Sequence, residues 1–171
     1  MKNALLVGAV FDCNVHLQAA AREKSVAAEC LRLVEKGSVR LYLSEEILAE
    51  VEDVLNRSEI RKHFQTLTDE IVEAFPVRLR KTSQIIRRVP KKFSYSRDPD
   101  DEPYINLAVE AKVDYLVSRD NDLLDLMTDY TLEAKEFRQK FRPLRVIEPL
   151  EFLEEVPCFL RAKRGGKQTE V

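Results

Sequence analysis

Acidic side chains gather in one stretch of the chain, SRDPDDEPYINLAVEAKVDYLVSRDNDLL at residues 96–124, where they flank an apolar segment that is typical of burial. Like charges that are brought together cost free energy unless a cation or a proton lies between them. These acids are therefore either a solvated surface or a site.

Other positions also place a carboxylate next to apolar residues. Asp12 directly follows the apolar run at residues 4–11, and Asp120 directly follows the segment DYLVS. Glu50 shares a helix face with Ile47 and Val54, because the three residues are spaced by about one helical turn. A glutamate on an apolar stripe is a conflict between local and global preference, and such conflicts tend to mark functional positions.

Carboxylates in this arrangement suit a hard divalent cation such as Mg²⁺, which prefers oxygen ligands. A bound cation of this kind lowers the pKa of its water and offsets negative charge that develops in a reaction. Taken singly, Asp101 or Asp120 is more often a helix cap or a surface charge than a ligand. No cap requires a glutamate at position 50, however, so the acids taken together favour a cation site.

The spacing of apolar residues along the chain predicts the strands and helices that must position these acids, because the spacing is different in strands and in helices. Strands are predicted at residues 4–11, 39–43, 114–118 and 142–149. Helices are predicted at 25–37, ending at Gly37, at 45–55 after a Ser44 cap, at 69–88 with a break near Pro76, at 101–112, at 121–127 and at 150–156. Residues 89–99 are predicted to be a loop, and residues 128–142 a polar loop or an irregular helix.

This alternation predicts an α/β fold in which helices cover both faces of a parallel sheet. Ligands of such sheets bind beyond the carboxyl ends of the strands, where the strand order reverses. If the strands that end before Asp12 and Asp120 are neighbours at that point, both carboxylates face one crevice.

The composition is that of a globular protein, with 44% hydrophobic residues, 34% charged residues and a net charge of −2. We predict one domain at residues 1–156 and a basic, disordered tail at residues 157–171. No apolar run approaches the roughly 20 residues of a membrane span. The cysteines are odd in number and lack a C-x-x-C pair, which favours a reduced cytoplasmic protein. Neither His16 nor His63 has a partner at metal-ligand spacing, so both are predicted to be surface or structural residues.

Several motifs in order resemble the PIN domain, and in particular its branch of toxins from bacterial toxin–antitoxin systems. They are VFDCNV, LSEEILAEVEDVL, the acidic stretch at residues 96–124 and the closing RVIEPLEFL, and the similarity runs from about residue 5 to residue 154. The resemblance implies a three-layer α/β/α sandwich, a mainly parallel sheet with strand order 3-2-1-4-5, and a ribonuclease that depends on Mg²⁺ or Mn²⁺.

The resemblance also implies the site residues. The catalytic and metal-binding acids carried over by motif are Asp12, Glu50, Asp101 and Asp120, with Asp122 as a fifth acid. Asp12 and Asp120 are expected to be the main ligands, and Glu50 and Asp101 to hold or deprotonate the attacking water. Asn14 and Ser118 are expected to support the site, whereas Cys13 stands where the family usually has threonine and lacks its hydroxyl.

The motifs of other α/β protein families that bind nucleotides or phosphate are not found in this sequence. A dinucleotide-binding fold or a P-loop would need a glycine-rich turn after the first strand, and Gly8 lies within that strand. A haloacid dehalogenase-type phosphatase would have an aspartate where Asn14 stands, and a response-regulator receiver would pair two adjacent acids near the end of the first strand. The alternative that stays open is a non-catalytic, RNA-binding or regulatory PIN domain.

A basic strip leads directly into the acidic stretch. Residues 74–97 contain no acid, and the strip is predicted to bind RNA through Arg87, Arg88, Lys91, Lys92 and Arg97. Phe93 and Tyr95, interleaved with these cations, are predicted to stack on unpaired bases. Single-stranded RNA, an antitoxin protein and a second copy of the chain are the expected partners, and no membrane is expected.

Overall fold

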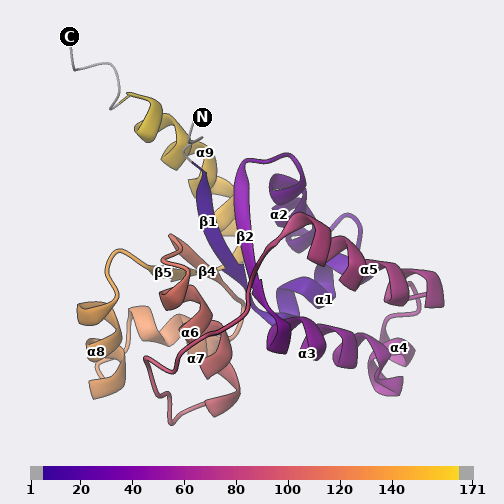
Figure 1. Cartoon of the computed structure of the whole chain (residues 1–171), viewed down its shortest axis with the longest axis horizontal. Coiled ribbons are helices and arrows are strands. Elements are labelled where there is room, and N and C mark those ends of the chain that lie inside the picture. The colour runs from indigo at the N-terminus through magenta and orange to yellow at the C-terminus, as the bar shows by residue number, and fades with distance from the viewer. Residues whose placement is uncertain (1–5, 166–171) are drawn as a thin grey trace.

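A five-stranded parallel sheet lies at the centre of the molecule, with the strand order β3-β2-β1-β4-β5 (Figure 1). The computed structural model describes residues 6–165. The strands are β1 Val7–Phe11, β2 Val39–Ser44, β3 Gln84–Ile86, β4 Tyr115–Val117 and β5 Arg145–Ile147. The predicted α/β/α sandwich and its strand order are confirmed.

Helices occupy most of the connections between the strands. They are α1 Cys13–Ala21, α2 Val26–Glu35, α3 Glu45–Asn56, α4 Ser58–His63, α5 Asp69–Thr82, α6 Glu102–Glu110, α7 Asn121–Leu124, α8 Leu132–Lys140 and α9 Pro149–Gly165, with short 3-10 turns η1 Pro99–Asp101 and η2 Asp125–Met127. Helices α2 and α9 pack on each other and on the sheet, and α6 packs against β1, β2 and β4 (Figure 1). Both faces of the sheet are therefore covered, as a parallel sheet requires.

Local sequence accounts for where several of these helices begin and end. The side chains of Ser25, Ser44 and Thr68 each accept a hydrogen bond from a backbone amide three residues further on, at the start of α2, α3 and α5. Gly37, just after α2, has a φ of 79°, a conformation that costs glycine little. Ser44 and Gly37 lie where the sequence predicts helix caps, whereas the caps at Ser25 and Thr68 were not predicted.

Three elements were not predicted from the sequence. Helix α1 buries Val15, Leu17 and Ala19 at positions that do not form one clean stripe, because it packs between other helices. Helix α4 buries no residue at all, and the edge strand β3 is too short to show alternation. Residues 128–142 are also more regular than predicted, because Thr131 caps α8.

Two prolines do not interrupt their helices. Helix α5 continues through Pro76, which is buried on the same side as Phe75 and Leu79, so the break predicted near Pro76 is wrong. Helix α9 continues through Pro157 to Gly165, which contradicts the predicted disorder for residues 157–165; residues 166–171 lie outside the described part. The extension packs through Phe159, whose ring lies 6.1 Å from that of Tyr115.

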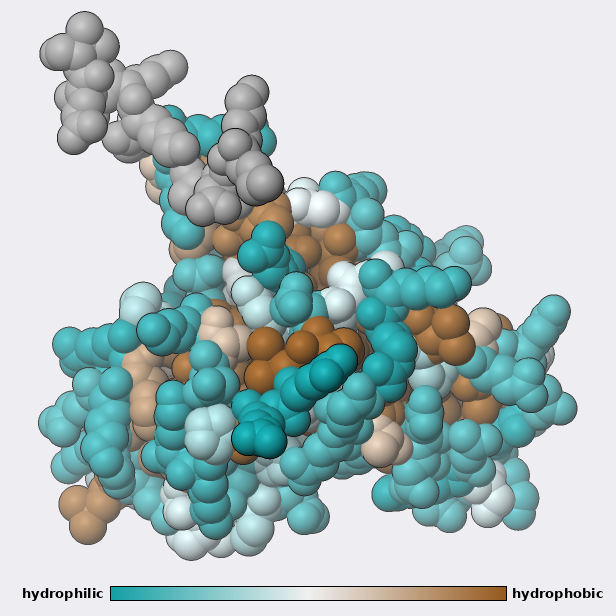
Figure 2. All heavy atoms as spheres, viewed as in Figure 1, coloured by the Kyte–Doolittle hydropathy of each residue, from teal (hydrophilic) through white to brown (hydrophobic). Residues whose placement is uncertain are grey.

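The surface seen in Figure 2 is mostly hydrophilic, with apolar patches between hydrophilic side chains. Large apolar side chains that reach solvent among the described residues include Val77, Tyr130, Leu132 and Leu150. Within residues 6–165, no helix combines the length and the apolar character needed to cross a membrane.

His16 is buried in the core with an exposed fraction of 0%, and neither ring nitrogen has a hydrogen-bond partner. Burial lowers the pKa of His16 from 6.5 to about 4. The unfolded chain therefore takes up this proton first as the pH falls. The contribution of His16 to stability is intact above the unfolded pKa and is lost as the pH falls from about 6.5 toward 4.

Replacing His16 with leucine is accordingly expected to flatten the pH dependence of unfolding. The variant should gain up to ~3 kcal/mol over the wild type at about pH 4.5, since one unit of pKa shift corresponds to about 1.4 kcal/mol. Urea unfolding followed by circular dichroism between about pH 4.5 and pH 7.5 measures this difference. His63→Leu, at an exposed position, is the matched control. Parallel pH curves for the wild type and His16→Leu would contradict the assignment.

Candidate metal centre

The acids converge at the carboxyl edge of the sheet, where β1 and β4 lie side by side. Phe11 pairs with Val117 in the parallel register, and the backbone amide of Asp12 donates to the carbonyl of Val117 at 3.0 Å. The strands that end before Asp12 and Asp120 are thus neighbours, as the crevice prediction requires. Strand β1 lies between β2 and β4, so the strand order reverses at β1. Ligands of parallel sheets bind at such a reversal.

Ser118 connects the acids of the two strands. Its hydroxyl donates to Asp12 Oδ2 at 2.7 Å and accepts from the backbone amide of Asp120 at 2.9 Å. The residue is fully buried, and its own amide donates to the carbonyl of Ile147 in β5. Ser118 therefore holds Asp12 and Asp120 in a fixed relation, a function that its hydroxyl group makes possible.

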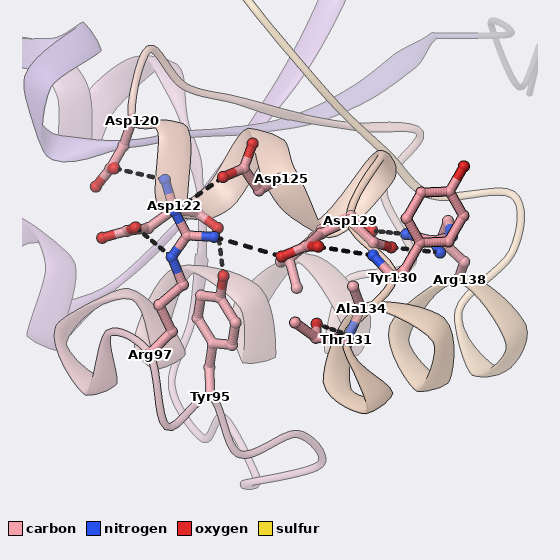
Figure 3. A network of polar contacts seen from close by, with 11 residues as sticks. Tyr95, Arg97, Asp120, Asp122, Asp125, Asp129, Tyr130, Thr131, Ala134 and Arg138 are labelled. Carbon is pink, nitrogen blue, oxygen red and sulfur yellow. Dashed lines mark hydrogen bonds and ion pairs between the residues drawn. The ribbon is translucent and has the colours of Figure 1, made fainter.

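Four aspartates form a cluster in which one carboxylate oxygen from each lies within 4.8 Å of the others: Asp98, Asp101, Asp120 and Asp122. Two of them also stabilise the turns that carry them. Asp98 Oδ1 accepts from the amide of Asp100 at 3.1 Å. Asp120 Oδ1 accepts from the amide of Asp122 at 2.9 Å, as Figure 3 shows. Capping and clustering are compatible, because each carboxylate uses one oxygen for the turn and has a second one.

Asp101 is the most constrained acid of the cluster. Its side chain is only 6% exposed, and Oδ2 is buried without a hydrogen-bond partner. Burial, followed by the charges of Asp120 and its neighbours, raises the pKa of Asp101 from 3.8 to about 8. A buried carboxylate oxygen without a donor is costly unless a proton or a cation meets it.

Asp12 and Glu50 lie beside this cluster. Burial raises the pKa of Asp12, and the charges of Asp120 and Glu50 add to that effect, although hydrogen bonds from Ser118 and from the amide of Cys13 oppose it. Glu50 is half-buried on α3, and its Oε2 accepts from the hydroxyl of Tyr104 on α6 at 2.5 Å. Asp12 is thus coupled electrostatically to Asp120, which precedes α7, and to Glu50 on α3.

The structure brings Asp101, Asp120 and Asp122 together and links Asp12 to them through Ser118. Glu50 is outside the group of oxygens within 4.8 Å, and Asn14 is exposed on α1. Asp98 is a member of the cluster that the sequence reasoning did not single out. It belongs to the same DPDD motif as Asp101, but nothing in the local pattern tells which of these aspartates turns inward.

The basic strip differs from its prediction. The rings of Phe93 and Tyr95 are only 4% and 3% exposed, so the predicted stacking on bases is wrong. Phe93 packs edge-on against Phe137 and Phe141 at centroid distances of 5.6 and 5.8 Å, because this loop covers an apolar face that α8 completes.

Of the five cations that are predicted to bind RNA, three have carboxylate partners. Lys91 pairs with Glu102 at 3.0 Å, and Lys92 pairs with Glu110 at 2.7 Å. Arg97 contacts acids at and near the cluster. Arg87 and Arg88 are exposed directly after β3, and among the described residues no ion pair engages them.

The donor set of this centre fits a hard divalent cation. All the clustered groups are carboxylates, and one of them, that of Asp101, has a buried oxygen, Oδ2, with no hydrogen-bond partner. No histidine or cysteine belongs to the cluster, which argues against a softer metal such as zinc.

Comparisons with known proteins find similarity over most of this chain. A profile of the PIN domain family matches residues 8–122. An uncharacterized protein of Methanocaldococcus jannaschii is 28% identical over 153 residues, which cover 88% of this chain and 92% of that protein. The matched region of the family begins in β1 and ends at Asp122, so it includes every acid of the centre.

Proposed function

Because the chain belongs to the PIN domain family, we propose that it is a metal-dependent endoribonuclease that hydrolyses phosphodiester bonds of RNA. PIN domains are usually metal-dependent nucleases, and the cluster of acids is suited to a divalent cation. The observation that carries the proposal is the buried Oδ2 of Asp101, which has no hydrogen-bond partner and belongs to a carboxylate that clusters with three others. A purely structural cluster would gain nothing from keeping that oxygen unpaired.

Mg²⁺ or Mn²⁺ is the proposed cofactor, held by Asp101 and Asp120 with Asp98 and Asp122 completing the set. When bound, such a cation supplies charge compensation at the scissile phosphate and lowers the pKa of water. Asp12, which Ser118 holds beside Asp120, adds negative charge and a further oxygen at the same edge. Glu50, which accepts a hydrogen bond from Tyr104 and is not one of the four clustered acids, is proposed to orient the attacking water and to accept its proton.

A nuclease assay with the purified full chain tests the proposal. Single-stranded RNA should be cleaved with Mn²⁺ or Mg²⁺ and should stay intact with EDTA, and internal cleavage products would distinguish an endonuclease from an exonuclease. RNA binding without cleavage under any of these conditions would favour the non-catalytic alternative instead.

Substrate binding is proposed to depend most on Arg87 and Arg88, the two predicted RNA-binding cations for which the described residues provide no ion pair. Replacing both with alanine should weaken binding of single-stranded RNA and flatten the log–log salt dependence by about 0.7 for each lost phosphate contact. Changing Lys91 and Lys92 to alanine should act in the same direction but less, because each already has a carboxylate partner.

Fluorescence anisotropy at several salt concentrations measures both effects. Lys36→Ala combined with Arg40→Ala is the matched control, since both residues are exposed near the amino end of β2. If the Arg87 and Arg88 changes leave affinity and slope unaltered, the strip is a solvated surface and not a binding surface.

We further propose that the nuclease is the toxin of a toxin–antitoxin pair, on the basis of the motif resemblance. An antitoxin is then expected to cover the crevice and to place a basic side chain near the acids, where charge complementarity favours it. Expression in a bacterial host should slow growth, and a small partner encoded nearby should co-purify and inhibit cleavage. An active enzyme with neither property would refute the toxin role and leave the nuclease proposal intact.

A further inference from the structure

Arg97 contacts three carboxylates at the border of the acid cluster, and their arrangement links two segments of the chain (Figure 3). Its Nε lies 2.6 Å from Asp122 Oδ1, Nη2 lies 2.8 Å from Asp125 Oδ2, and Nη1 lies 3.7 Å from Asp129 Oδ2. Asp122 belongs to the cluster, whereas Asp125 and Asp129 do not. One guanidinium thus connects the cluster with the segment that follows α7.

The segment that carries Arg97 needs such contacts. Residues 87–98 contain no helix or strand, although they deliver Asp98 to the cluster. Their position rests on side-chain hydrogen bonds, such as the one from the Tyr95 hydroxyl to the carbonyl of Asp122 at 2.5 Å (Figure 3). Asn106 accepts from the amides of both Lys92 and Phe93. Arg97 is the last of these contacts before Asp98, and the only one that reaches a carboxylate of the cluster from this described segment.

The chemistry of arginine suits a positioning role. The guanidinium is planar and stays charged, so it fixes the orientation of the carboxylates that it binds. It engages Oδ1 of Asp122, and the carboxylate has a second oxygen that this ion pair does not use. Partners that orient a metal ligand through its second atom contribute to metal affinity even though they never touch the metal.

We infer that Arg97 is a positioning residue of the metal centre, which orients Asp122 and ties the segment carrying Asp98 to α7 and η2. The inference rests on the proposed function, since it concerns the binding of the proposed cation. It assigns to Arg97 a role distinct from the RNA contact that the sequence predicts.

A purely electrostatic role for Arg97 would have the opposite sign. A positive charge next to a cation site disfavours cation binding, so removing it would tighten binding, most strongly at low ionic strength. The side chain of Arg97 is 39% exposed, however, and solvent screens such a charge. A loss of positioning weakens binding at any ionic strength, so the two roles can be separated by experiment.

Isothermal titration of the full chain with Mn²⁺ at low and high salt tests the inference. Arg97→Met should raise the Kd by about tenfold at both salt concentrations, a typical cost of losing a partner that orients a metal ligand. Arg97→Lys should retain part of the affinity. Asp125→Asn should act in the same direction as Arg97→Met but less, and the double variant should be no weaker than Arg97→Met, because both changes remove one network.

Arg145→Met is the matched control. Arg145 also binds two carboxylates, Glu151 and Glu155, at 3.0 and 2.7 Å, and its side chain is 44% exposed. It lies at the first residue of β5, at the edge of the sheet opposite the acids. Its replacement removes a comparable network and should leave the Kd for Mn²⁺ unchanged.

Unchanged or tighter Mn²⁺ binding by Arg97→Met, or an equal loss in Arg145→Met, would overturn the inference while the nuclease proposal stands. If Arg97→Met does not fold, Asp125→Asn decides, and an unaltered Kd in that variant overturns the inference. A wild-type chain that binds no Mn²⁺ would overturn the proposed metal site and this inference with it.

Discussion

Replacing Asp120 with asparagine is expected to abolish metal-dependent cleavage, with a loss of at least about a hundredfold, since even indirect partners of a metal typically contribute 10- to 100-fold. The helix should remain intact, because asparagine keeps the Oδ1 acceptor for the amide of Asp122 and caps helices as well as aspartate does. Asp12→Asn should have a similar effect, since it removes charge next to the cluster and alters the bond from Ser118. Cleavage rates at saturating Mn²⁺ measure both losses.

Asp114→Asn is a suitable control for these variants. Asp114 also accepts a hydrogen bond from a backbone amide, that of Gly8 at 2.9 Å, but it lies before β4, at the opposite edge of the sheet. Its replacement should leave the rate of cleavage unchanged. Full cleavage by both Asp120→Asn and Asp12→Asn would exclude the acid cluster as the active site.

Replacing Asp101 with asparagine is expected to stabilise the metal-free protein. The folded pKa of Asp101, about 8, is far above its ordinary value of 3.8, so the folded state holds this proton more tightly than the unfolded chain. Stability is therefore lost as the pH rises from about 4 through about 8, where the buried carboxyl must ionise. Asparagine escapes this loss and should raise the free energy of unfolding in EDTA at about pH 8.5 by a few kcal/mol, as each unit of pKa shift corresponds to about 1.4 kcal/mol.

Urea unfolding at about pH 4.5 and pH 8.5, with EDTA or with Mn²⁺, tests this expectation. The advantage of Asp101→Asn should disappear at the lower pH, and Mn²⁺ should stabilise the wild type more than the variant. Asp100→Asn, at the exposed neighbouring position, is the control. A variant that is less stable than the wild type at high pH in EDTA would show that Asp101 is a structural partner and not a strained ligand.

These expectations share one physical cause. The sheet brings the ends of β1 and β4 together and forces several carboxylates into one place, so the metal-free centre stores electrostatic repulsion. The Ser118 hydroxyl and the Arg97 guanidinium reduce that repulsion only in part. A bound cation would remove most of the remainder, which is why activity and stability should respond to the same residues in opposite ways.

The sequence by itself determined the architecture and most of the acids. Alternating strand and helix periods predict the α/β/α sandwich, because each period depends on residues close together in the chain. The resemblance to PIN domains supplies the strand order, and the family is confirmed over residues 8–122. Asp101, Asp120 and Asp122 could also be predicted from the sequence, because they belong to local motifs at the ends of predicted elements.

Only the tertiary structure decided how these acids are arranged and which neighbours serve them. Ser118 and Asp12 are 106 positions apart in the chain, and their contact depends on the pairing of β1 with β4. Arg97 and Phe93 lie in a segment without regular structure, whose local sequence is as compatible with an exposed RNA-binding strip as with a packed loop. The segment forms a packed loop because Phe93 contacts Phe137 of α8 and Arg97 pairs with Asp122 and Asp125. Where a segment has no regular backbone hydrogen bonds, contacts of this kind with distant residues outweigh local propensity.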